Sequence, residues 1–74
     1  MSKKDKIEDK IKDLNATRAM YHRDLEEFER RYKEKQISKE ELEKHNINYE
    51  KKREKIRNKI NSLEEKLEKI RKNP

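Results

Sequence analysis

Large apolar residues recur along this chain at alternating spacings of four and three positions, in two separate runs. The first run contains Ile7, Ile11, Leu14, Tyr21, Leu25, Phe28 and Tyr32, with Arg18 at its one polar position. The second contains Leu42, Tyr49, Ile56, Ile60, Leu63, Leu67 and Ile70, with Asn46 and Arg53 at its polar positions. This is the heptad pattern that places one stripe of an α-helix against another helix, and it lacks the alternation of a strand. Two long helices are therefore predicted.

The composition supports helices once this periodicity is taken into account. Charged residues make up 54% of the chain and apolar residues only 27%, a balance that indicates disorder in a chain without pattern. The chain has no glycine and one proline, and its lysine, glutamate, isoleucine and leucine are typical of long helices with charged surfaces. Without glycine we expect no residue in the left-handed region, no phosphate-binding loop and no tight β-hairpin.

The segment between the two runs carries the signals of a helix start. Ser38 can accept a hydrogen bond from the first turn of the second helix, and Glu41 can reach back to it, as in a capping box. Ile37 and Leu42 stand on either side of the cap, at the positions of a hydrophobic staple. The second helix is therefore expected to begin immediately after Ser38.

Because the connection is short, the two helices are expected to be antiparallel neighbours. The predicted fold is all-α, an antiparallel two-helix coiled-coil hairpin that forms one domain over residues 1–74. Its parts are a first helix at about 3–35, a turn at 36–38 and a second helix at about 39–72. The register that sets Phe28 against Asn46 and Tyr21 against Arg53 leaves no layer with two polar residues. Two helices cover their seam on one side only, so we expect a homodimer in a four-helix assembly, with a monomeric hairpin as the alternative.

The positive charge is concentrated in the middle of the predicted rod. The net charge is +6, and residues 51–59 carry six bases and one acid, while the opposing residues 15–23 add two bases and no acid. Seven of these bases form a candidate anion or nucleic-acid patch, namely Arg18, Arg23, Lys51, Lys52, Lys55, Arg57 and Lys59. Such a band would contact phosphates in a salt-dependent and largely sequence-independent way. An ordinary solvated helix surface or an acidic protein partner would fit the same pattern.

A second candidate surface lies on the least charged part of the first helix. The heptad pattern places Ala16, Ala19 and Met20 outside the seam, and Ile47 is a further apolar residue outside it. Small residues allow a partner helix to approach closely, and methionine adapts to irregular contacts, so these four residues form a candidate docking face. The alternative is that the alanines serve only as helix formers.

The residues of catalytic and metal chemistry are sparse. His22 and His45 each have a glutamate one helical turn away, but a metal site needs three or four convergent ligands and an enzyme needs a pocket. We therefore expect no enzymatic activity, no metal, no cofactor and no small-molecule substrate. The chain has no apolar stretch long enough to span a membrane and no apolar segment after its charged start, and it has no cysteine, so a cytoplasmic location is expected.

Together these features predict a non-catalytic protein that acts through protein–protein contacts, by self-association or by docking a partner helix. The alternative is a small basic protein that binds DNA or RNA through the central band. In architecture alone the predicted hairpin resembles those of RNA-binding plasmid copy-number regulators and of phage scaffolding proteins.

Overall fold

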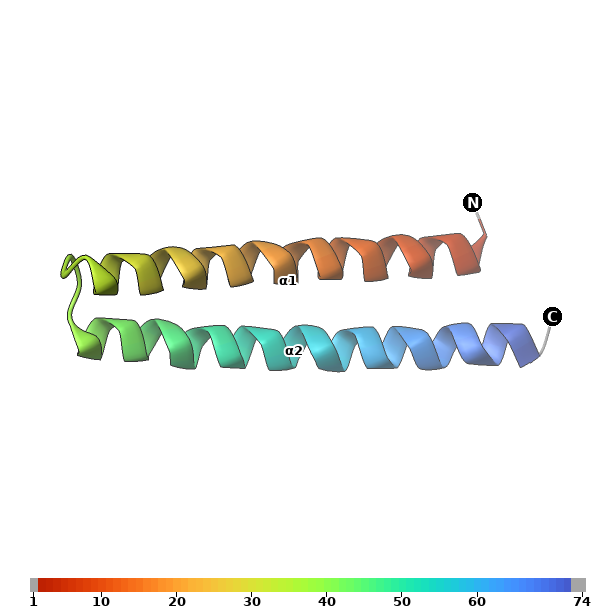
Figure 1. Cartoon of the computed structure of the whole chain (residues 1–74). Helices are drawn as coiled ribbons and strands as arrows, with labels where there is room; N and C mark the ends of the chain where they lie inside the picture. The colour runs from red at the N-terminus through yellow and green to blue at the C-terminus, as the bar shows by residue number, and fades with distance from the viewer. Residues whose placement is uncertain (1, 73–74) are drawn as a thin grey trace.

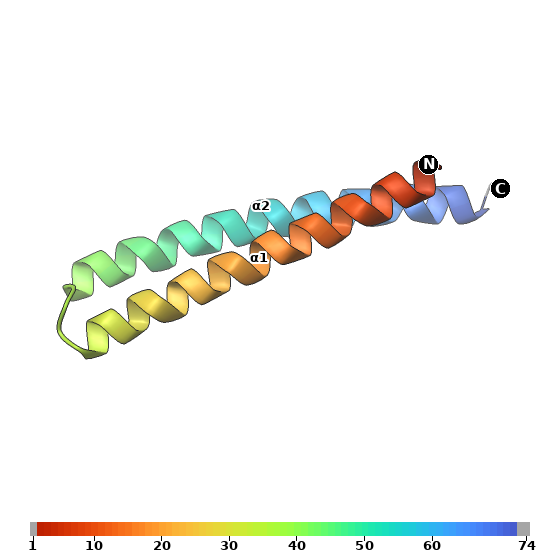
Figure 2. The ribbon, with the colours of Figure 1, turned by 90° about the horizontal axis from the view of Figure 1, so that it is seen from above.

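Two long α-helices joined by a short loop make up the computed structural model of the chain, which describes residues 2–72 (Figure 1). Helix α1 spans Lys3–Lys33 and helix α2 spans Lys39–Lys72. The helices run antiparallel and cross at a small angle, so the start of α1 and the end of α2 lie at the same end of the rod (Figures 1 and 2). The rod measures 56 × 18 × 12 Å. The prediction of an all-α helical hairpin is confirmed.

Helix α1 ends two residues earlier than the sequence predicted, in a Schellman motif. The backbone N–H of Gln36 donates to the carbonyl of Arg31 at 2.8 Å, and that of Lys35 donates to the carbonyl of Tyr32 at 3.0 Å. The motif requires a left-handed residue, and Lys35 adopts this conformation with a φ of 61°. The expectation that no residue of a glycine-free chain would do so is wrong. The bonds that satisfy the last carbonyl groups of α1 offset the steric cost.

Both helices begin at a serine cap. The N–H of Asp5 donates to the Oγ of Ser2 at 3.1 Å, and the N–H of Glu41 donates to the Oγ of Ser38 at the same distance. The Ser38 hydroxyl also donates to the Glu41 carboxylate at 3.3 Å, so the return bond of the predicted capping box involves the hydroxyl of Ser38 and not its N–H. These caps fix where each helix starts.

The core of the hairpin is small and belongs to one helix. Among the described residues only Ile56, Ile60 and Leu67 are buried, and all three lie in the half of α2 that is far from the loop. The other apolar seam residues are half-buried, apart from Tyr32, which is exposed. Two helices cannot enclose the stripe between them, so one side of most seam residues stays open.

Two of the three polar side chains that were predicted to lie in the seam, one on each helix, point out to water. Arg18 and Arg53 are exposed, while Asn46 is half-buried as expected. Thr17 is half-buried in place of Arg18, and its hydroxyl donates to the carbonyl of Asp13 at 3.0 Å. Turning the guanidinium groups out to water avoids their desolvation, which a two-helix seam could not compensate.

Aromatic contacts between the helices show the register near the loop. The ring of Phe28 stacks on that of His45, with centroids 3.5 Å apart and 9° between planes. The Nζ of Lys52 lies 4.7 Å from the ring centroid of Tyr21. Each of these partners is one residue before the one predicted, which was Asn46 for Phe28 and Arg53 for Tyr21.

Candidate functional site

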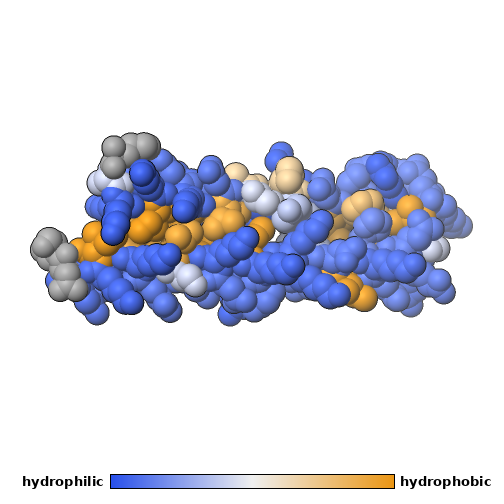
Figure 3. Space-filling model, turned by 180° about the vertical axis from the view of Figure 1, so that it is seen from behind, coloured by the Kyte–Doolittle hydropathy of each residue, from blue (hydrophilic) through white to orange (hydrophobic). Residues whose placement is uncertain are grey.

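A groove runs between the helices in the half of the hairpin that is far from the loop. Figure 3 shows it as a strip of apolar surface along the seam, bordered on both sides by hydrophilic side chains. It consists of two hollows of about 570 and 440 Å³ that share Lys10, Leu63 and Lys66 as lining residues, so the two are continuous. The groove is therefore an open extension of the seam.

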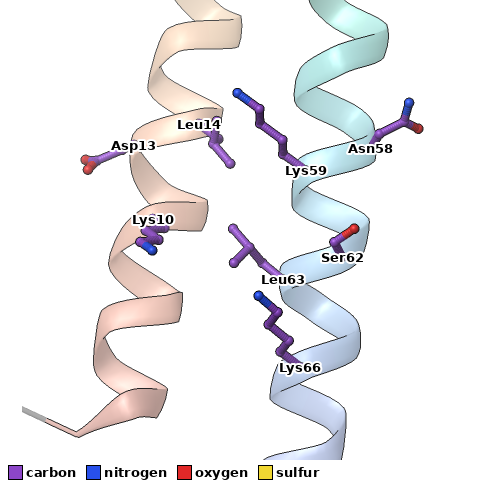
Figure 4. Close-up of a pocket in the computed structure, with 8 residues that line it drawn as sticks. All are labelled: Lys10, Asp13, Leu14, Asn58, Lys59, Ser62, Leu63 and Lys66. Carbon is purple, nitrogen blue, oxygen red and sulfur yellow. The ribbon is translucent and has the colours of Figure 1, made fainter.

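The floor and the rim of the groove differ in chemistry. The floor consists of Ile7, Leu14, Leu63 and Ile70, all of which are half-buried. The rim carries six lysines, three from each helix: Lys3, Lys6, Lys10, Lys59, Lys66 and Lys69. In the close-up, Leu14, Leu63, Lys59 and Lys66 project into the space between the helices (Figure 4). An apolar floor between two basic walls can accept a ligand that is itself apolar in the middle and anionic at its edges.

The rim lysines have little anionic compensation within the chain. The one acid that lines the groove is Asp13, and its carboxylate points away from the groove (Figure 4). Eight ion pairs are formed within residues 2–72, every one between residues three or four apart within one helix or its C-cap, and none includes a rim lysine. The groove thus concentrates positive potential over an apolar surface.

Toward the loop the seam is covered by its own side chains. His45 stacks on Phe28, and Lys52 lies over the ring of Tyr21. A smaller hollow of about 90 Å³ remains there. The two large hollows over apolar side chains therefore lie in the half that contains the rim lysines.

The predicted basic band does not form one face. All seven of its residues are exposed. Lys52, Lys55 and Lys59 have helical spacing and so share a stripe. Arg57 is two residues from Lys59, which turns it about 200° around the helix axis, and it forms an ion pair with Glu54 at 3.8 Å. The remaining members are Arg18, Arg23 and Lys51.

Five of the six rim lysines were missed by the search for a basic band, because that search followed charge along the chain. Of the rim, only Lys59 belongs to the predicted patch. The signal that finds the others is spacing, since lysines three, four or seven positions apart flank the apolar seam along one side of each helix. These are Lys3, Lys6 and Lys10 on α1, and Lys52, Lys55, Lys59, Lys66 and Lys69 on α2.

The predicted docking face is divided by the structure. Ala16, Ala19 and Met20 are exposed on α1 at helical spacing, with Met20 46% exposed. Ile47 is 56% exposed on α2. It lies two residues beyond His45, which faces Phe28, so Ile47 and Met20 are separated by about 9 Å along the rod axis. The structure brings the three α1 residues together but not Ile47 with them.

The histidines take part in local contacts. The Nε2 of His22 lies 2.8 Å from the Glu26 carboxylate, and its Nδ1 lies 3.3 Å from the hydroxyl of Tyr49 across the seam. Across residues 2–72, no three histidine, aspartate or glutamate side chains are grouped so that they could hold a metal ion. Neither helix contains an apolar stretch that would allow it to cross a bilayer.

Among the described residues, the groups with shifted pKa values belong to a cluster near the end of α1. Arg30 donates to Glu27 and to Glu34, and Arg31 also donates to Glu27. The hydrogen bond from Arg30 is the main cause that lowers the pKa of Glu27 from 4.5 to about 2, and the same contact raises the pKa of Arg30. All of these side chains are exposed or half-buried at the surface, so the cluster stabilises the end of α1 and offers no enclosed site.

Comparison of the chain with protein-family profiles, with curated proteins and with solved structures found no match.

Proposed function

We propose that this protein is a non-catalytic helical hairpin that acts through protein–protein contacts, by docking a partner helix or by self-association. The observation that carries the proposal is the apolar floor of the groove, which the two helices leave half-exposed. A third helix laid along the seam would bury it, which is the common way in which helices bind an amphipathic helix. Burying this apolar surface would add considerably to the stability of a fold in which three of the described residues are buried.

The groove is a better docking site than the outer face of α1. Ala16, Ala19 and Met20 form a convex surface on one helix, whereas the groove is concave and is lined by both helices. Scattered exposed apolar residues are ordinary on protein surfaces, while a continuous apolar groove is a feature of binding sites. We therefore assign docking to the groove.

The test is to compare variants of the groove floor with variants of the outer face. The assays are sedimentation of the protein alone and titration with amphipathic helical peptides that are acidic, neutral or basic. Leu63→Asn should weaken association, whereas Met20→Asn, a matched change at an exposed position, should not. Circular dichroism checks that both variants remain helical. If the protein is monomeric and binds none of the peptides, the proposal is wrong.

A second candidate function is nucleic-acid binding, which is favoured by the lysines of α2 without an acidic partner. In the described part of the chain, Lys51, Lys52, Lys55 and Lys59 form no ion pair. Binding through them should weaken steeply as salt rises, because it depends on release of counterions from the phosphates. Gel shifts with duplex DNA and structured RNA at two salt concentrations test this. Absence of a shift at low salt would exclude nucleic-acid binding. Helix docking is ranked first because phosphates bound to these lysines would leave the apolar floor of the groove exposed to water.

A further inference from the structure

We infer that the groove is built for an acidic amphipathic helix, with apolar residues in the middle of its contact face and glutamate or aspartate on both sides. This inference rests on the proposed function and adds to it the chemistry of the partner. Three properties of the groove support it: its shape, its charge and the arrangement of that charge on two opposite walls.

The shape of the groove fits one helix. The lining residues span Lys3 to Leu14 on α1 and Asn58 to Ile70 on α2, which is about 16 to 18 Å along the axis, or about three helical turns. The floor presents side chains from both helices, so a third helix would insert its apolar residues between them. A flat lipid surface could not fill a concave groove of this kind.

The charge of the groove fits an acidic partner. Each wall contributes three lysines, and the carboxylate of Asp13 is turned away. A helix with acids on both sides of its apolar stripe would meet lysines on both walls. The long lysine side chains could cover the edges of the partner with their methylene groups while their ammonium groups reach its carboxylates. A basic or neutral helix would leave the six positive charges uncompensated.

The same charge argues against a second copy of this chain as the occupant. A symmetric dimer brings the same surface of both subunits together, so a groove-to-groove contact would set the six rim lysines of one copy against those of the other. Like charges placed opposite each other are destabilising. The groove therefore selects a partner that differs from the chain itself.

The probe for the test is a labelled peptide of about three heptads, with leucine at the a and d positions and glutamate at e and g. A matched peptide carries lysine at e and g. Binding of each to the full chain is measured by fluorescence anisotropy at low and at high salt. We expect the glutamate peptide to bind more tightly than the lysine peptide, with an affinity that falls as salt rises.

Two triple variants of exposed residues identify the site. In the groove variant Lys10, Lys59 and Lys66 are changed to glutamate, and in the control variant Lys12, Lys44 and Lys51, which do not line the groove, are changed in the same way. Both variants change the net charge equally. The groove variant should bind the glutamate peptide at least about tenfold more weakly, since three attractive pairs become repulsive, and it should bind the lysine peptide more tightly than the wild type does. The control variant should bind as the wild type.

The outcomes separate this inference from the proposed function. Equal binding of both peptides by the wild type, with loss of binding in Leu63→Asn, would retain helix docking but overturn the acidic partner. Equal weakening in the groove and control variants would also overturn it, because the attraction would then come from net charge and not from the rim. Binding of anionic phospholipid vesicles through the rim lysines, by a protein that is monomeric in sedimentation and binds neither peptide, would overturn both proposals.

Discussion

Replacing Lys35 by glycine should stabilise the hairpin, although the change removes a charged side chain from a turn. Lys35 is held at a φ of 61° by the Schellman motif that ends α1. A residue with a Cβ atom pays about 1 to 2 kcal/mol in this region, and glycine does not. Glycine loses about 0.4 to 1 kcal/mol more conformational freedom on folding. The balance favours Lys35→Gly over Lys35→Ala by about 0.5 to 1 kcal/mol.

The assay is thermal unfolding followed by circular dichroism, at two protein concentrations in case the hairpin associates. For a chain of this size, the expected gain corresponds to a rise in midpoint of about 2 to 8 °C relative to Lys35→Ala. The alanine variant removes the same side chain but keeps the Cβ atom, so it separates loss of charge from relief of strain. The matched control is Lys44→Gly, in the second turn of α2, which should destabilise by about 1 kcal/mol. If Lys35→Gly is no more stable than Lys35→Ala, the turn is not closed through a left-handed residue.

The remaining predictions concern the caps, the core and the surface charges. Ser38→Ala should destabilise the hairpin by about 1 kcal/mol in urea unfolding, because the N–H of Glu41 loses its acceptor, whereas Ser62→Ala should change stability little. Ile60→Ala removes a buried side chain and should cost about 2 to 4 kcal/mol, enough to unfold much of the protein at room temperature, while Ile47→Ala at an exposed site should cost under about 0.5 kcal/mol. The pKa of Glu27 is lower in the folded state than in the unfolded state, so ionised Glu27 stabilises the fold. This stabilisation is present above about pH 4.5 and is lost as the pH falls toward 2. Glu27→Gln should therefore make the free energy of unfolding less dependent on pH in this range. The difference in pH dependence between the wild type and Glu27→Gln should shrink in high salt, since the Glu27 side chain is at the surface.

The hairpin itself could be predicted from the sequence because independent signals agree on it. The heptad spacing gives the two helices, and Ser38 with Glu41 marks the start of the second one, which begins at Lys39 as expected. The end of α1 was placed two residues too late because its stop signal is a backbone conformation of Lys35, which no residue type announced. A helix start that is marked by capping side chains can be predicted from the sequence, whereas a helix end that depends on a backbone φ angle of a lysine cannot.

The positions within the seam could be predicted only to within one residue. Arg18 continues the alternating spacing, and Thr17 next to it does not, yet Thr17 is the one that is half-buried. The choice between neighbours depends on how much it costs to desolvate each side chain, which spacing does not measure. The groove was missed for a related reason, because its lysines are close in space on two helices but are spread over both ends of the sequence.

The placement of the core has a consequence for how the hairpin folds. Ile56, Ile60 and Leu67 lie far from the loop, and no residue in the half of the hairpin next to the loop is buried. Contacts near the loop join residues that are close in sequence, so they cost little chain entropy, but they bury little apolar surface. The contacts that bury most apolar surface join positions separated by more than half of the chain. The hairpin should therefore fold as one cooperative unit, and the slowest amide exchange should be found in the distal half of α2.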